Sequence, residues 1–203
     1  MLEEQRKRLK NRDGEYLSIG ITEGGLPRSA IGVPWNFTSN AYNMLTPNVY
    51  IEKEDLNDEE IMAEIMKHKV VGCYISVPLE DYSFLRSFVY LGDLAIENGY
   101  MLSDISFMRE LHDCRMLYLH GAHLENLDDV IETKKIIKTR YVYCLCLNNC
   151  KIDDISSVLE NERLGYSEFI VITPQGSGEK QRWKGFKQGS RRFNIREYVP
   201  KDK

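Results

Sequence analysis

Two histidines and three cysteines lie near one another in the sequence, and both residue types can bind zinc or take part in nucleophilic catalysis. They are His120, His123, Cys144, Cys146 and Cys150. The chain has no Cys-x-x-Cys pair of the kind that marks most zinc sites. A cysteine nucleophile needs a base and a group that orients the base. Cys146 and His120 could supply the nucleophile and the base, but the sequence indicates no third residue to orient the base. We therefore predict no metal, no cofactor and no catalytic residue, with a Cys/His-dependent enzyme kept as an alternative.

The C-terminal segment offers a different chemistry. Residues 179–203 contain nine Lys and Arg against three Asp and Glu, whereas the whole chain has a net charge of −4. Trp183, Phe186 and Phe193 lie among these basic residues, and such a mixture can neutralise phosphates while aromatic rings stack on bases. The interpretation that we prefer is a terminal cap whose aromatic residues cover the last repeat. Nucleic-acid binding by this tail is the alternative function.

The bulk composition narrows the class of protein. The chain has 203 residues, of which 42% are hydrophobic and 29% charged, as in an ordinary globular protein. The first thirteen residues are polar and lack the apolar stretch of a signal peptide, and no window approaches the length of a membrane span. Five cysteines, an odd number, indicate reduced thiols rather than a disulfide framework. We expect a cytoplasmic protein with no membrane partner.

A repeated pattern of apolar residues predicts the strands that position these cysteines, histidines and aromatic residues. Seven times, two apolar residues stand two positions apart, as expected of short strands with one buried face. The second members of the pairs are separated by 24, 21, 23, 28, 24 and 24 residues, a spacing typical of solenoid repeats. The pairs are Val49/Ile51, Cys73/Ile75, Leu94/Ile96, Leu117/Leu119, Leu145/Leu147, Phe169/Val171 and Phe193/Ile195.

The most regular part of the chain resembles a known family. Residues 91–160 contain Leu91-x-x-Leu94-x-Ile96 and Val142-x-x-Leu145-x-Leu147-x-x-Cys150-x-Ile152. This spacing resembles a leucine-rich repeat, and the Leu-x-Asp-Ile-Ser turn at 102–106 is similar to internalin-like bacterial repeats. The pattern is interrupted by an insertion at 132–140. Gly99 and Ala122 stand where the family has a ladder asparagine, and only Cys150 matches that position.

The expected fold class is therefore α/β. The resemblance implies a leucine-rich-repeat solenoid with a single parallel sheet of about five to seven short strands, capped at both ends. We divide the chain into a leader and N-terminal cap (1–45), the solenoid (46–172) and a basic C-terminal cap and tail (173–203). The strand-like run 16–21 is assigned to the N-terminal cap. A helix is expected to begin at Asn57, with Glu60 three residues on as in a capping box.

The function that the resemblance implies is protein–protein interaction without catalysis. Residues between and beside the apolar pairs should point away from the core, onto the concave face of the sheet. Two tyrosines in the central column suit a binding surface, because tyrosine is enriched at interface hot spots. We predict that a protein partner binds there. The predicted partner-binding residues are Tyr74, Asp93, Glu97, Met116, Tyr118, His120, Cys146 and Asn148.

Overall fold

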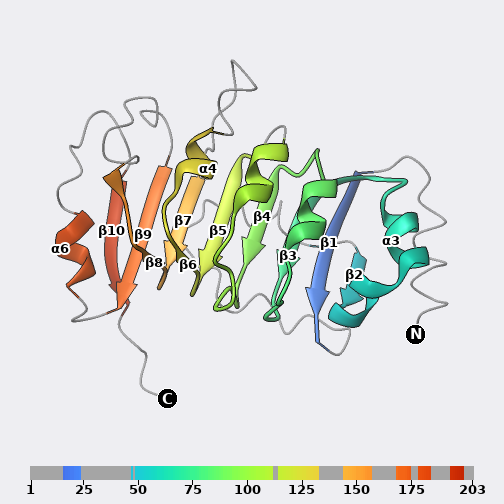
Figure 1. The fold of residues 1–203 in the computed structure, drawn as a ribbon, viewed down its shortest axis with the longest axis horizontal. Helices are drawn as coiled ribbons and strands as arrows, with labels where there is room; N and C mark the ends of the chain where they lie inside the picture. Colours follow the sequence, from blue (N-terminus) through green and yellow to red (C-terminus); the bar gives the residue numbers. More distant parts are fainter. Residues whose placement is uncertain are drawn as a thin grey trace.

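The chain forms an α/β structure around one parallel sheet. The computed structural model describes residues 16–23, 47, 49–111, 114–132, 144–156, 168–174, 178–183 and 193–198. Within this part of the chain, eight strands pair in the order β10-β9-β7-β5-β4-β3-β1-β2, and every pair is parallel (Figure 1). The α/β class and the parallel sheet are thus confirmed.

The strand bounds follow the predicted apolar pairs closely. Each pair from Val49/Ile51 to Phe193/Ile195 lies within one strand, and neighbouring pairs are matched in register across the sheet. The strands of the large sheet are β1 (Tyr16–Thr22), β2 (Val49–Glu52), β3 (Lys69–Ile75), β4 (Asp93–Ile96), β5 (Met116–His120), β7 (Cys144–Asn148), β9 (Glu168–Pro174) and β10 (Phe193–Tyr198). A small second sheet pairs β6 (His123–Leu124) with β8 (Lys151–Ile152).

β1 occupies a position that the sequence did not reveal. The run at 16–21 was expected in a cap outside the first repeat strand. Instead, β1 lies inside the sheet and pairs with β2 on one side and β3 on the other. Its residues keep the repeat register, because Ile21 stands opposite both Ile51 and Ile75. The residues at 16–21 predict a strand. They do not predict which strands pair with it.

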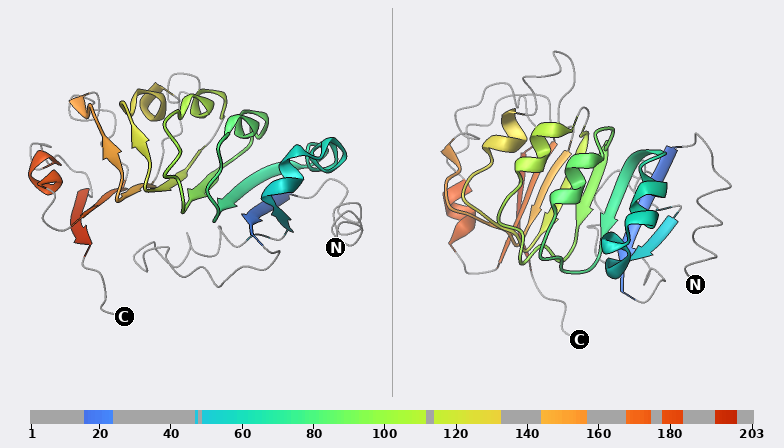
Figure 2. Two further views of the ribbon diagram at one scale, coloured as in Figure 1. Left: turned by 60° about the horizontal axis from the view of Figure 1, so that its bottom comes forward. Right: turned by 45° about the vertical axis from the view of Figure 1, so that its right-hand side comes forward.

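The connections between strands carry short helices. Asp58, rather than Asn57, is the N-cap of α3, and its carboxylate accepts hydrogen bonds from the amides of Glu60 (2.9 Å) and Ile61 (3.1 Å). Asn57 instead ends a preceding 3-10 turn. The helices are η1 (Lys53–Asn57), α3 (Glu59–Ile65), η2 (Ser83–Ser87), η3 (Ser106–Glu110), α4 (Asp128–Glu132) and α6 (Glu179–Trp183). Figure 2 shows these helices along one side of the curved sheet.

The main core lies between the sheet and these helices. The first core cluster contains both members of the pairs in β2, β3, β4, β5 and β7, each almost fully buried. Residues of the connections complete it, including Leu85 of η2, Met108 of η3 and Trp183 of α6. Since alternate residues of a strand point to opposite faces, the prediction that the pairs face the core is confirmed for these strands.

At the C-terminal end, the repeat register continues further than the leucine-rich segment. β10 pairs in parallel with β9 over six residues, so the sheet extends to Tyr198. Segment 173–203 was expected to be a cap, and it contributes a strand to the sheet. The insertion at 132–140 lies outside the described residues beyond Glu132.

Candidate functional site

The structure brings the eight predicted partner-binding residues onto one face of the sheet. Tyr74, Tyr118 and Cys146 form a row across β3, β5 and β7, with Ala95 of β4 between the two tyrosines. One flanking row contains Glu97, His120 and Asn148 near the carboxyl ends of the strands, and the other contains Asp93 and Met116. We call this surface the helix-free face, because the described helices lie on the other side of the sheet (Figure 2).

The centre of the helix-free face is buried. Tyr118 is 1% exposed and Cys146 is 0% exposed, and both belong to a second apolar cluster that is separate from the main core. Tyr74, Asp93, Met116 and Asn148 are also buried. An open surface at these positions was the premise of the predicted binding site, and six of the eight residues do not meet it. Glu97 and His120 alone retain partial exposure.

Hydrogen bonds hold the polar side chains along the carboxyl ends of the strands. Asn148 Nδ2 donates to Tyr118 Oη at 3.1 Å. The His120 ring hydrogen-bonds the backbone of Glu97, and its Nε2 lies 3.5 Å from Tyr100 Oη. Burial lowers the pKa of His120 despite that backbone bond, so the ring is neutral at neutral pH. Burial also raises the pKa of the Tyr118 hydroxyl, so Tyr118 stays protonated.

Beside this row, an exposed rim borders the helix-free face. Tyr100 and Met101 follow β4 and are 58% and 54% exposed. The Tyr100 ring packs against His120, with 5.7 Å between ring centroids. It also covers Gly121, where an added Cβ would lie 2.5 Å from the Tyr100 ring, and Gly121 has a positive φ of 78°. Tyr100 is therefore an exposed aromatic side chain whose position is fixed by its neighbours.

The described cysteines and histidines lie in separate environments. Burial raises the pKa of Cys150 to about 12, so its thiol is not a nucleophilic thiolate at neutral pH. His123 pairs with Asp153 at 3.1 Å on the small sheet rather than with His120. Within the described residues, no group of three His, Cys, Asp or Glu side chains could hold a metal ion. The side chain of Cys144 is not among those that the structure describes.

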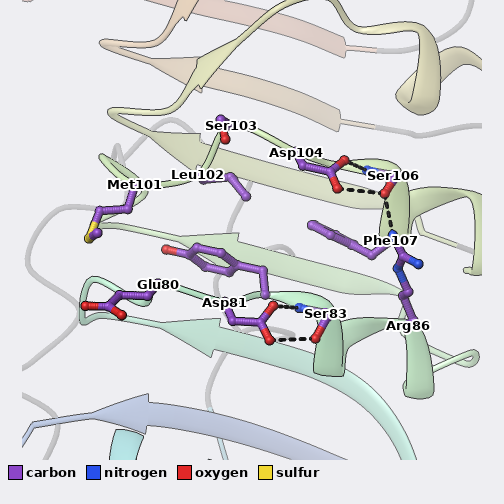
Figure 3. A pocket seen from close by; sticks show the side chains of 11 residues that line it. Glu80, Asp81, Ser83, Arg86, Met101, Leu102, Ser103, Asp104, Ser106 and Phe107 are labelled. Atoms are coloured by element: carbon purple, nitrogen blue, oxygen red, sulfur yellow. Dashed lines mark hydrogen bonds between the residues drawn. The ribbon is translucent and has the colours of Figure 1, made fainter.

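A shallow pocket on the helical side was not predicted from the sequence. It has a volume of about 120 Å³ and lies between the turns at 80–86 and 101–107 (Figure 3). Ser83 and Ser106 each hydrogen-bond the aspartate two residues before them, which lowers the pKa values of Asp81 and Asp104. Arg86 reaches across to Ser106 Oγ at 2.6 Å. The signal in the sequence is the spacing Leu-x-Asp-x-Ser, which occurs at 79–83 as well as at 102–106.

The basic tail is described only in part. Trp183 is buried in the main core, so its ring does not present an exposed face on which a base could stack. Phe186 and the side chain of Phe193 lie outside the described residues, as do most of the basic side chains.

None of the helices in the described ranges is long and apolar enough to cross a lipid bilayer. Comparisons with protein-family models, with curated proteins and with solved structures find no match to this chain.

Proposed function

We propose that the chain is a leucine-rich-repeat-like solenoid. The support is a turn that recurs after successive strands with the same hydrogen bond. Asp81, Asp104 and Asp154 each accept a bond from the amide of the serine two residues on, at 2.7, 2.7 and 2.8 Å. Asn126 accepts the equivalent bond from Asp128 at 3.0 Å. A solenoid in which each unit contacts its neighbours accounts for this recurrence.

Side chains that join one turn to the previous one also support a solenoid. Cys150 Sγ donates to the carbonyl of Leu119 at 3.3 Å, which is the role of the ladder position in this kind of repeat. The Asn98 side chain donates to the carbonyl of Ser76, one position before the glycine that replaces the family asparagine. The backbone carbonyls of Ser76 and Leu119 are thus satisfied by side-chain donors other than a ladder asparagine.

The function that we propose is non-enzymatic binding of a protein partner. The observation that carries this proposal is Tyr100, which is largely exposed yet fixed between His120 and Gly121. An aromatic ring held in place before binding loses little conformational entropy on association, and tyrosine is enriched among hot-spot residues. Met101 extends the same exposed rim. The partner would therefore contact the rim of the helix-free face rather than the buried Tyr118.

The experiment compares two exposed tyrosines. Proteins captured from a lysate by the wild-type chain are identified, and the affinity of the purified partner is then measured by calorimetry. Tyr100→Glu should weaken binding by about tenfold or more, because it removes an anchoring ring. Tyr90→Glu is the matched control, since Tyr90 is 50% exposed in the β3–β4 connection, before β4 begins.

Equal affinities for wild type and Tyr100→Glu would rule out the rim as the binding surface. Circular dichroism of both variants checks that neither substitution disturbs the fold. Tyr118→Glu is not suitable for this purpose, because a charge at a fully buried position would destabilise the protein regardless of any partner.

A further inference from the structure

The helix-free face is buried, although no described helix or strand lies over it. The second apolar cluster contains seven side chains, and none of them is more than 8% exposed. The described helices contribute instead to the main core on the other face. The side chains in the cluster are those of Tyr74, Ala95, Met116, Tyr118, Cys146, Ile170 and Ile172.

The strand order indicates which connection crosses this face. From β2 to β3 and on to β10, the chain advances across the sheet in one direction, and its helices cover one face. The step from β1 to β2 goes in the opposite direction. Parallel crossovers are right-handed in roughly 98% of cases. If the direction reverses and the hand is kept, the β1–β2 connection must pass over the opposite face, which is the helix-free face.

The sequence of this connection suits such a role. Residues 23–48 include two charged residues only, Glu23 and Arg28. The remainder is rich in apolar and aromatic residues, which are stabilised by burial against an apolar surface elsewhere in the protein. These residues are Leu26, Ile31, Val33, Trp35, Phe37, Tyr42, Met44 and Leu45.

The other long segments outside the described residues suit the role less well. Residues 1–15 contain nine charged residues, and residues 199–203 are Val-Pro-Lys-Asp-Lys. Residues 133–143, 157–167 and 184–192 belong to the β5–β7, β7–β9 and β9–β10 crossovers, which advance in the common direction. The same rule of handedness assigns these crossovers to the helical side.

We propose that the β1–β2 connection, residues 23–48, packs on Tyr74, Tyr118 and Cys146 and makes the helix-free face an internal interface of this chain. The face is then a second core rather than a docking surface. This inference does not depend on the proposed function, since binding at the exposed rim requires no access to the centre of the sheet.

Photo-crosslinking tests the identity of the cover. Benzoylphenylalanine replaces Tyr118 in the full-length protein, and mass spectrometry identifies the peptide that it captures. A crosslink to residues 23–48 in a band of monomer mass is expected. A crosslink to any other segment outside the described residues (1–15, 133–143, 157–167, 184–192 or 199–203), a band of dimer mass, or capture of another protein would each overturn the proposal. The same probe at Tyr82, which is buried on the helical side, is the control.

Labelling of two natural cysteines gives a second measurement, which needs no substitution within the helix-free face. Cys73 and Cys146 are both buried, but they point to opposite faces of the sheet. In wild type, both should be protected from a maleimide. Replacing residues 26–45 by a glycine–serine chain of equal length should raise the labelling rate of Cys146 at least about tenfold more than that of Cys73. Unchanged protection of Cys146, or rapid labelling in wild type, would contradict the proposal.

Discussion

Glu97 is an acidic side chain in an environment that disfavours its charge. It follows β4 on the helix-free face, and its Oε1 is buried with no hydrogen-bond partner among the described residues. Desolvation raises the pKa of Glu97, and a hydrogen bond with Tyr74 lowers it only in part. The folded protein therefore holds this proton to a higher pH than the unfolded chain does, and ionisation of Glu97 costs stability.

Replacing this carboxylate by an amide should show that cost. Between the unfolded and the raised folded pKa of Glu97, the native state binds more protons, so the free energy of unfolding falls as pH rises. Glu97→Gln removes that loss. We expect the variant to match wild type near pH 4 and to be more stable at pH 7, in urea titrations across this range. Glu125→Gln, at an exposed position, should show no such divergence; a variant less stable than wild type at pH 7 would contradict the argument.

At this scale, the sequence predicted which side chains share a face but not how far they are buried. The period-two alternation of strands placed Tyr74, Tyr118 and Cys146 together, because it depends on local geometry alone. Their burial depends on what lies over the sheet, and this is a non-local property. The same limit applies to Cys73 and Cys150, whose pKa values burial raises to about 12.

At the scale of elements, the recurring aspartate turns stabilise the connections on the helical side. Asp104 accepts bonds from the amide of Ser106 at 2.7 Å and from its hydroxyl at 3.0 Å. The start of η3 is thus held in the way that an N-cap holds an α-helix. The sequence indicated the turn at 102–106 through its Leu-x-Asp-Ile-Ser spacing. It placed the N-cap of α3 one residue too early, at Asn57 instead of Asp58, because both residue types can cap a helix.

Removal of one turn carboxylate should have a measurable cost. Asp104→Ala leaves the Ser106 amide without its acceptor, and we expect a loss of about 0.5–2 kcal/mol in the free energy of unfolding. Ser103→Ala, at an exposed position in the same turn, should change stability by less than about 0.5 kcal/mol. Chemical denaturation at neutral pH gives both values. An equal effect of the two substitutions would show that the turn bonds do not contribute.

At the scale of the whole molecule, the insertion of β1 between β2 and β3 is the main departure from a sequential repeat. The spacing of apolar pairs predicted seven of the eight strands and their mutual register, because each step repeats the same local unit. It could not predict the position of β1, since both neighbours of that strand come later in the chain. Strand pairing of this kind is decided by the completed sheet and not by local pattern.

A pair of matched substitutions distinguishes an inner β1 from an outer one. Ile19 of β1 and Ile51 of β2 are both buried, but β1 has a strand on each side and β2 lies at the edge of the described sheet. Ile19→Ala should cost about 3–5 kcal/mol, and Ile51→Ala should fall near the lower end of the usual range of about 2–5 kcal/mol. Urea unfolding of both variants gives the comparison; a larger cost at Ile51 would place β1 outside the sheet.

The position of β1 also bears on the order in which the chain folds during synthesis. A simple repeat array can nucleate at any unit and grow in either direction. Here β1 leaves the ribosome first, but its partners β2 and β3 begin only at Val49 and Lys69. Contacts that close long loops form late, so we expect the units from β3 to β7 to supply the local nucleus. We expect β1 to stay unpaired, and exposed to wrong partners, until β2 and β3 have formed beside it.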